Sequence, residues 1–175
     1  MSKKALGLCK YLLLFALLIF FDFISKAYVY HNIPIMSWMT PAYPFGGLGV
    51  FENFYGINVA ICHVQNTGCA WGMFSQYSEV IFFIRIILIF ALVIYTFFLN
   101  QEKEKSFPLF LIVTGAIGNV IDFFVYGKVI DMFYFYTKAY SFPVFNLADS
   151  FISVGIGLLL LQSCMTYFKI KKLKS

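Results

Sequence analysis

The chain has 175 residues, of which 61% are hydrophobic and only 12% are charged. An average soluble domain carries about 25% charged residues because its surface needs them, so this composition argues against a soluble enzyme, a disordered chain and a nucleic-acid-binding protein. The net charge of +5 comes largely from lysines at the two ends, which is typical of membrane orientation signals. A helical span needs about 20 apolar residues, so a polytopic membrane protein with four to six spans is expected.

The first apolar run covers about residues 8–29. No convincing small-residue cleavage site follows it, and the run is long enough to span a membrane, so we expect an uncleaved first helix. Residues 31–77 are dense in proline and glycine, which argues against a long helix. Short runs at 56–61 and 62–64 are consistent with strands. This segment is predicted to form a small β-rich element outside the hydrocarbon or at its boundary.

Three further spans are predicted at about 78–99, 107–126 and 147–168. The third begins at Phe107-Pro108, where proline is tolerated in the first helical turn. Residues 127–146 are too broken for a span and indicate an interfacial connection. We therefore expect an all-α membrane protein with four transmembrane helices and a small β-rich outer element, forming a single integral membrane domain over residues 1–175.

Lysine positions predict the orientation in the membrane. Lysines occur at the N-terminus, in the 100–105 turn and at the C-terminus, whereas residues 31–77 contain no lysine or arginine. By the positive-inside rule, both termini are expected in the cytoplasm. Segments 31–77 and 127–146 then lie on the outer side.

Ionisable residues within membrane spans are costly and suggest function. A rise of about 1.5 Å per residue places Asp22 and Asp122 about 18–22 Å from the cytoplasmic ends of their spans. Asp131 lies just beyond the third span, and Asp149 opens the fourth from the outside. The four aspartates are therefore expected to converge on the outer third of the bilayer, where Arg85 could supply a counter-charge.

Paired carboxylates suggest an aspartyl hydrolase. Two carboxylates held close together share a proton, so one can activate water while the other protonates the leaving group. Any single aspartate can instead be interfacial or paired with lysine, and Asp149 could cap its own helix. Cys62, His63 and Cys69 lack an evident fourth ligand, so no metal is expected. A Cys62–Cys69 disulfide is possible, but nothing in the sequence requires it.

Five blocks, in order along the chain, carry a resemblance to a known family. They are Asp22-Phe23-Ile24-Ser25-Lys26, Asn66-Thr67-Gly68-Cys69-Ala70-Trp71-Gly72, Gly115-Ala116-Ile117-Gly118-Asn119-Val120-Ile121-Asp122, Val129-Ile130-Asp131-Met132-Phe133, and Phe142-Pro143-Val144-Phe145-Asn146-Leu147-Ala148-Asp149-Ser150. Together, between four predicted spans, they resemble the lipoprotein signal peptidases of bacteria, the type II signal peptidases.

The resemblance assigns roles to these residues. Asp131 and Asp149 match the catalytic aspartate pair. Residues matching positions that support the pair, shape the site and help position the substrate are Asp22, Lys26, Asn66, Gly68, Gly118, Asn119, Asp122, Asn146 and Ala148. The implied activity is removal of the signal peptide from a prolipoprotein, by cleavage before its diacylglyceryl-modified cysteine. The resemblance also implies a monomer in the bacterial inner membrane, in contact with lipid, with its site near the outer leaflet and no nucleic-acid partner.

One departure from the family pattern occurs at Phe123, where the family usually has arginine after the aspartate of its third block. Arg85, Lys26 or Lys128 could replace that charge. No cofactor is expected, because paired carboxylates and water suffice. Two alternatives stay open from the residues alone: a small four-span ion-coupled transporter and a non-catalytic membrane scaffold. The apolar cytoplasmic halves of the spans argue against a transport route.

Overall fold

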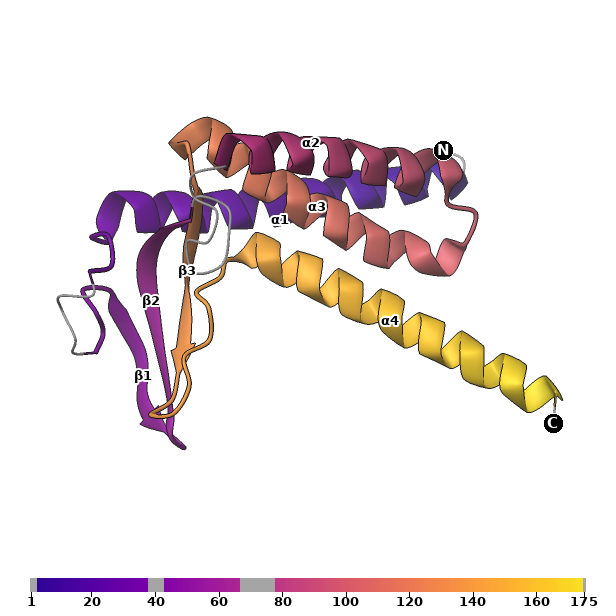
Figure 1. The fold of residues 1–175 in the computed structure, drawn as a ribbon. Helices are drawn as coiled ribbons and strands as arrows, with labels where there is room; N and C mark the ends of the chain where they lie inside the picture. The colour runs from indigo at the N-terminus through magenta and orange to yellow at the C-terminus, as the bar shows by residue number, and fades with distance from the viewer. Residues whose placement is uncertain (1–2, 38–42, 67–77, 175) are drawn as a thin grey trace.

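The computed structural model describes residues 3–37, 43–66 and 78–174. Four long helices make up most of the described chain, and a small sheet lies across one end of them (Figure 1). In chain order, the elements are α1 (Lys3–Asn32), β1 (Leu48–Phe54), β2 (Ile57–Asn66), α2 (Ser78–Ile94), the π-helical turn η3 (Tyr95–Leu99), α3 (Lys103–Tyr126), β3 (Val129–Tyr136) and α4 (Leu147–Lys174).

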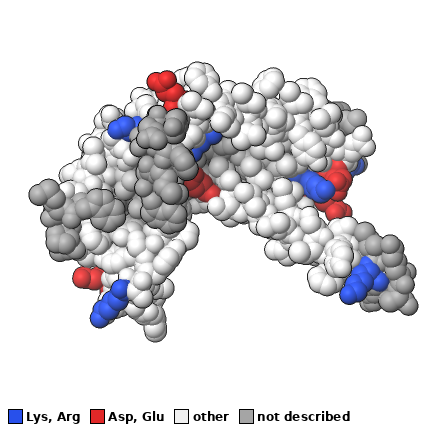
Figure 2. Space-filling model, in the orientation of Figure 1, with Lys and Arg blue, Asp and Glu red and all other residues white. Residues whose placement is uncertain are grey.

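All four helices contain a stretch that is long and apolar enough to cross a membrane. These stretches are Cys9–Asn32, Glu79–Leu99, Lys103–Tyr126 and Leu147–Lys169. In α1, α2 and α4, the described side chains are mostly exposed on the isolated chain, as expected for surfaces that face lipid. Figure 2 shows few charged groups over the helices. The chain is a multi-pass membrane protein with four helices, as the sequence predicted.

The start of α3 differs from the sequence-based expectation. The helix begins at Lys103, so Pro108 lies inside it rather than in its first turn. Proline has no N–H to donate to the carbonyl four residues earlier, which here is the carbonyl of Glu104. That oxygen instead accepts a hydrogen bond of 2.9 Å from Gln162 Nε2 on α4. The neighbouring helix thus compensates for the proline.

Helix α3 is the central helix of the bundle. It contacts α1, α2, α4 and β3, and it carries most of the buried apolar side chains found in the four helices. Its contact with α4 is close because Gly115 lies directly against the backbone of Ala148, where a Cβ atom would clash with the carbonyl group. Small residues allow this approach between membrane helices. The start of α4 is therefore held tightly against the middle of α3.

The sheet is antiparallel, with strand order β1-β2-β3. Its first two strands come from the 31–77 segment, which the sequence predicted to be rich in β-structure. The third strand comes from residues 127–146, so the prediction that confined the β-rich element to residues 31–77 is wrong. The first four residues of β3 are all buried, so the strand lacks the alternation that usually identifies a half-buried strand.

A small apolar cluster fixes the sheet to the helices. Val29 and Ile33 near the end of α1 pack with Ile130 and Met132 of β3, and all four are buried. Since these two β3 residues flank Asp131 in the chain, the cluster holds the backbone of that aspartate against the helical bundle.

Candidate active site

Asp131 is buried in β3 and accepts hydrogen bonds from two asparagine side chains. Asn66 Nδ2 at the end of β2 donates to Asp131 Oδ2 at 2.9 Å, and Asn146 Nδ2 donates to Asp131 Oδ1 at 2.7 Å. The strand pairing places Asn66 opposite Val129, two residues before Asp131, so both side chains lie on the same face of the sheet. Both carboxylate oxygens are therefore oriented by amide donors.

Asp149 is held at the start of α4 by a reciprocal pair of hydrogen bonds with Asn146. The backbone N–H of Asp149 donates to Asn146 Oδ1 at 2.9 Å, and the backbone N–H of Asn146 donates to Asp149 Oδ2 at 3.3 Å. This is the geometry of a capping box. Asn146 is therefore the N-cap residue, and the sequence-based alternative in which Asp149 caps its own helix is wrong.

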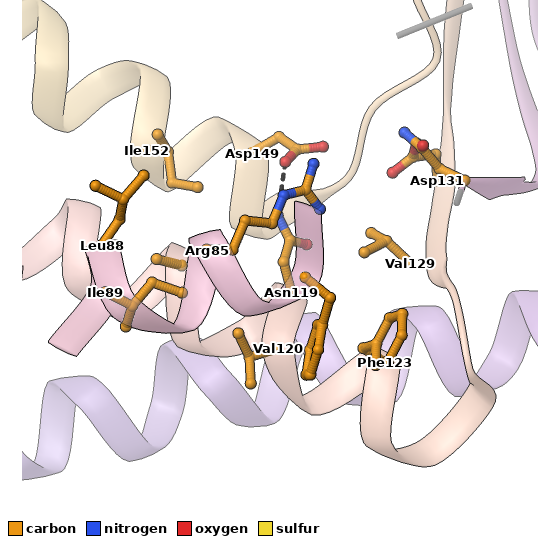
Figure 3. Close-up of a pocket in the computed structure, with 13 residues that line it drawn as sticks. Arg85, Leu88, Ile89, Asn119, Val120, Phe123, Val129, Asp131, Asp149 and Ile152 are labelled. Carbon is orange, nitrogen blue, oxygen red and sulfur yellow. Dashed lines mark hydrogen bonds between the residues drawn. The ribbon is translucent and has the colours of Figure 1, made fainter. Parts of the chain in front are cut away.

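Two asparagines connect the two aspartates. Asn119 Nδ2 on α3 donates to Asp149 Oδ1 at 2.8 Å, the bond drawn as a dashed line in Figure 3. Asn146 Nδ2 contacts Asn119 Oδ1 at 3.2 Å in addition to Asp131. A continuous chain of hydrogen bonds therefore runs from one carboxylate to the other.

Lys26 lies fully buried behind this network. Its Nζ atom is 2.7 Å from Asp22 Oδ2, 2.8 Å from Asp122 Oδ2 and 3.1 Å from Asn119 Oδ1. A buried ammonium group is tolerated only when it is paired and hydrogen-bonded. These contacts join α1 to α3 immediately beside the aspartate pair.

The two acids that bind Lys26 also bind the backbone next to each candidate catalytic aspartate. Asp22 Oδ1 accepts from the N–H of Ala148, the residue before Asp149, at 2.8 Å. Asp122 Oδ2 accepts from the N–H of Ile130, the residue before Asp131, at 3.2 Å. The ion cluster thus positions both aspartates through the residue that precedes each of them.

Gly118 and Ala148 make room for this cluster. A Cβ atom at Gly118 would lie 2.8 Å from Asp22 Oδ2 and 3.2 Å from the Cβ atom of Ala148. Ala148 is itself completely buried. A larger side chain at either position would separate the helices that bring the carboxylates together.

Asp131 and Asp149 line one pocket of about 280 Å³. Its other polar residues are Asn66, Arg85 and Asn119, the last two of which are labelled in Figure 3. The remaining walls are apolar and come mainly from α2, α3 and α4: Phe82, Leu88, Ile89, Ala116, Val120, Phe123, Val129 and Ile152. The pocket therefore combines an apolar wall with a polar end that holds two acids.

Burial and charge make Asp131 a weak acid. Its pKa is raised to about 7, chiefly by loss of hydration and secondly by the neighbouring charge of Asp149, while the hydrogen bonds from Asn66 and Asn146 act in the opposite direction. A carboxyl group with this pKa exchanges a proton readily near neutral pH, which suits acid–base catalysis.

All but one of the site residues expected from the sequence gather here. The exception is Gly68, which lies outside the described residues. Cys69 also lies outside them, so the possible Cys62–Cys69 disulfide stays a hypothesis.

Phe123 forms a stack with Phe82 of α2, with ring centroids 3.9 Å apart and planes inclined by 16°. The sequence indicated Arg85 as a possible counter-charge for the aspartates, and Arg85 lines the pocket that holds both of them. The stacked pair of Phe82 and Phe123 was not predicted. The spacing of Phe82, Arg85 and Ile89 along α2, at intervals of three and four residues, is the signal that could have indicated one helix face.

The fold and the site define a multi-pass membrane protein with two acidic residues in a shared pocket. Comparison with known proteins identifies the family. Residues 14–165 match the family model for signal peptidase (SPase) II, so the chain belongs to the signal peptidase II family. It is accordingly a peptidase, and therefore a hydrolase.

Individual relatives agree with this membership. A lipoprotein signal peptidase of Bartonella henselae is 37% identical over 152 residues, covering 83% of each chain. A lipoprotein signal peptidase of Chlamydia pneumoniae is 34% identical over 154 residues, covering 85% of this chain and 86% of the relative.

Two solved structures have the same fold. Both are described as bacterial membrane enzymes. The match to the first has a TM-score of 0.67 at 25% identity and covers 89% of this chain and 88% of the chain in that structure. The match to the second has a TM-score of 0.65 at 26% identity and covers 87% of this chain and 91% of the chain in that structure.

Proposed function

We propose that this chain is an intramembrane aspartyl endopeptidase that removes the signal peptide from diacylglyceryl-modified prolipoproteins, cleaving before the lipidated cysteine. Membership of the signal peptidase II family supports the removal of signal peptides from prolipoproteins. The observation that carries the aspartyl mechanism is the position of Asp131 and Asp149 in one pocket, joined by hydrogen bonds through Asn119 and Asn146.

In the proposed reaction, the aspartate pair holds a single proton at neutral pH, because two close carboxylates do not both ionise. The ionised member removes a proton from a water molecule, which adds to the scissile carbonyl carbon. The protonated member then gives its proton to the departing amide nitrogen, and the C–N bond breaks. Carboxylates and water account for every atom in this step, so the proposal includes no cofactor.

The pocket has the features that such a substrate requires. A signal peptide and two acyl chains are apolar, and the pocket walls contributed by α2, α3 and α4 are apolar as well. The sheet lies at the same end of the helices as the aspartates (Figure 1). We propose that this end faces the outer leaflet of the bacterial inner membrane, with both termini in the cytoplasm, and that the whole chain acts as one monomeric membrane domain surrounded by lipid.

An in vitro processing assay tests the mechanism. The full chain, purified in detergent, is mixed with a lipidated prolipoprotein, and the released signal peptide is measured. Asp131→Asn and Asp149→Asn keep the shape of each side chain and remove its charge. Each is expected to reduce cleavage about 10³-fold, because acid–base catalysis contributes about 10²–10⁴-fold and the loss of one member of a pair that acts as a unit disables the other. Insertion and abundance should persist.

Glu102→Gln provides the matched control. Glu102 is exposed at the opposite end of α3, so the same chemical change there should leave cleavage at the wild-type rate. A prolipoprotein without the diacylglyceryl group tests the substrate, and it should be cut poorly. Normal cleavage by either aspartate variant would refute the aspartyl mechanism, and equal cleavage of the two substrates would refute the requirement for lipid.

A further inference from the structure

Arg85 is the single arginine of the chain, and it lies in the middle of an apolar helix. Phe82 and Ile89 lie one turn away on either side and line the same pocket. The neighbouring residues Ile84 and Ile87 are largely exposed on the lipid-facing side of α2. The helical repeat therefore directs Arg85 towards the pocket and away from lipid.

The guanidinium group lies at the polar end of the pocket. Figure 3 shows the Arg85 side chain extending from α2 towards the space between Asp149 and Asp131. Of the pocket-lining residues that the structure describes, Arg85 alone carries a positive charge. A charge within a membrane span is costly and indicates a function when it faces the protein interior.

The charges around the aspartate pair are unbalanced without Arg85. Asp131 faces Asp149 on α4, while α1 contributes Asp22 and Lys26 and α3 contributes Asp122. Lys26 is already bound by two of these carboxylates. Elsewhere on the sheet, His63 Nδ1 bonds Ile33 O, and Lys128 donates to Gln65. The described groups near the pair thus include four carboxyl groups and one buried ammonium, so a second cation on the pocket side is electrostatically favourable.

We propose that Arg85 is a positioning residue of the active site: from α2, its guanidinium balances the charge of Asp131 and Asp149 and keeps the pair in its singly charged, reactive form. This inference rests on the proposed function for its catalytic meaning. Its electrostatic part concerns only the attraction between Arg85 and the aspartates. Arginine suits this role because it stays protonated at all relevant pH values.

Phe123 offers an independent way to test the need for charge. It belongs to α3 but lines the same pocket, where it stacks on Phe82. An arginine at position 123 can keep a stacking contact with that ring while adding a cation. If the pocket needs positive charge rather than the shape of one side chain, cations introduced from either helix should act in the same direction.

The pH dependence of kcat/KM for a lipidated prolipoprotein gives the first readout. Arg85→Gln should move the acid limb of the profile to higher pH by about one unit, because the carboxyl pair loses a neighbouring positive charge. Since each pKa unit corresponds to a tenfold change in protonation, cleavage at a pH below that limb should fall about tenfold. Arg85→Lys should keep the limb in place. Phe123→Arg, with Arg85 intact, should move it to lower pH. Ile87→Gln places the same glutamine on the lipid-facing side of α2 and should leave the limb unmoved.

A double-mutant cycle measured by thermal unfolding gives a readout that does not depend on cleavage. The loss of Tm caused by Arg85→Gln should grow between pH 5 and pH 8 when Asp131 is present, and it should be independent of pH in the Asp131→Asn background. An unmoved acid limb together with a cycle that shows no pH-dependent coupling would overturn the role of Arg85 and leave the proposed function intact. Normal cleavage by Asp131→Asn with the coupling preserved would instead refute the aspartyl mechanism and support the charge pairing.

Discussion

The Nζ atom of Lys26 lies 2.8 Å from Oδ2 of Asp122, and both side chains are almost completely buried. The same carboxylate oxygen accepts the backbone N–H of Ile130, which precedes Asp131. A buried ion pair contributes little net stability by itself, but removing one partner leaves an uncompensated charge. The main role of the Lys26–Asp122 ion pair is therefore to fix the position of β3 against α3, and its net contribution to stability is small.

Lys26→Met is expected to destabilise the protein strongly. The substitution leaves Asp22 and Asp122 buried without their cation, for which about 3–5 kcal/mol is a typical loss when a buried pair is broken. Thermal unfolding in detergent measures the effect. Lys105→Met is the control, because the ion pair of Lys105 with Glu102 is solvent-exposed and such pairs contribute little. Equal Tm values for Lys26→Met and the wild type would contradict the positioning role of the cluster.

Gly118→Ala should impair both stability and cleavage. The added Cβ atom would lie 2.8 Å from Asp22 Oδ2, and overpacking of this kind costs about 1–3 kcal/mol. Gly157→Ala is the matched control on α4, since nothing lies within 4 Å of its Cβ position. Comparison of Tm and processing rate for the two variants tests the prediction, which fails if both behave alike.

Two variants of Asn146 separate its structural role from its site role. Serine is a good N-cap but lacks an amide donor, so Asn146→Ser should retain most of the cap energy of about 1 kcal/mol that Asn146→Ala loses. Both variants remove the hydrogen bond to Asp131, and both should reduce cleavage at least tenfold, the change that corresponds to about 1.4 kcal/mol. Unfolding curves and rates are measured in parallel. Wild-type cleavage by Asn146→Ser would show that the amide is dispensable.

The stability of the protein should depend on pH through Asp131. Its pKa in the folded state is raised from an ordinary value of 3.8 to about 7, chiefly by burial, so the folded state binds the proton more tightly than the unfolded state. This contribution is complete below pH 4 and is lost as the pH rises towards 7 and beyond. Asp131→Asn cannot ionise, so its Tm relative to the wild type should increase between pH 4 and pH 8. A Tm difference that stays constant with pH would contradict the raised pKa.

Local properties of the chain were sufficient to predict the four helices. Apolar runs of about 20 residues have few alternatives to a membrane helix, because each backbone polar group must be satisfied within its own segment. The aspartates could be assigned to one end of the helices for a similarly local reason, since the rise per residue fixes the depth of Asp22 and Asp122. The ordered motifs then indicated which residues to group, and all but Gly68 of that group lie together in the described structure.

Long-range packing decided the remainder. Strand β3 was not predicted because its first half is buried on both faces, so no alternation marks it. The N-cap role of Asn146 depends on where α4 begins, and helix ends are set by single hydrogen bonds that composition does not reveal. The sequence by itself determined which residues are too polar for lipid. Only the tertiary structure decided that Lys26 neutralises Asp22 and Asp122 while Arg85 reaches the pocket from another helix, because such pairings depend on helix rotation and on contacts between segments far apart in the chain.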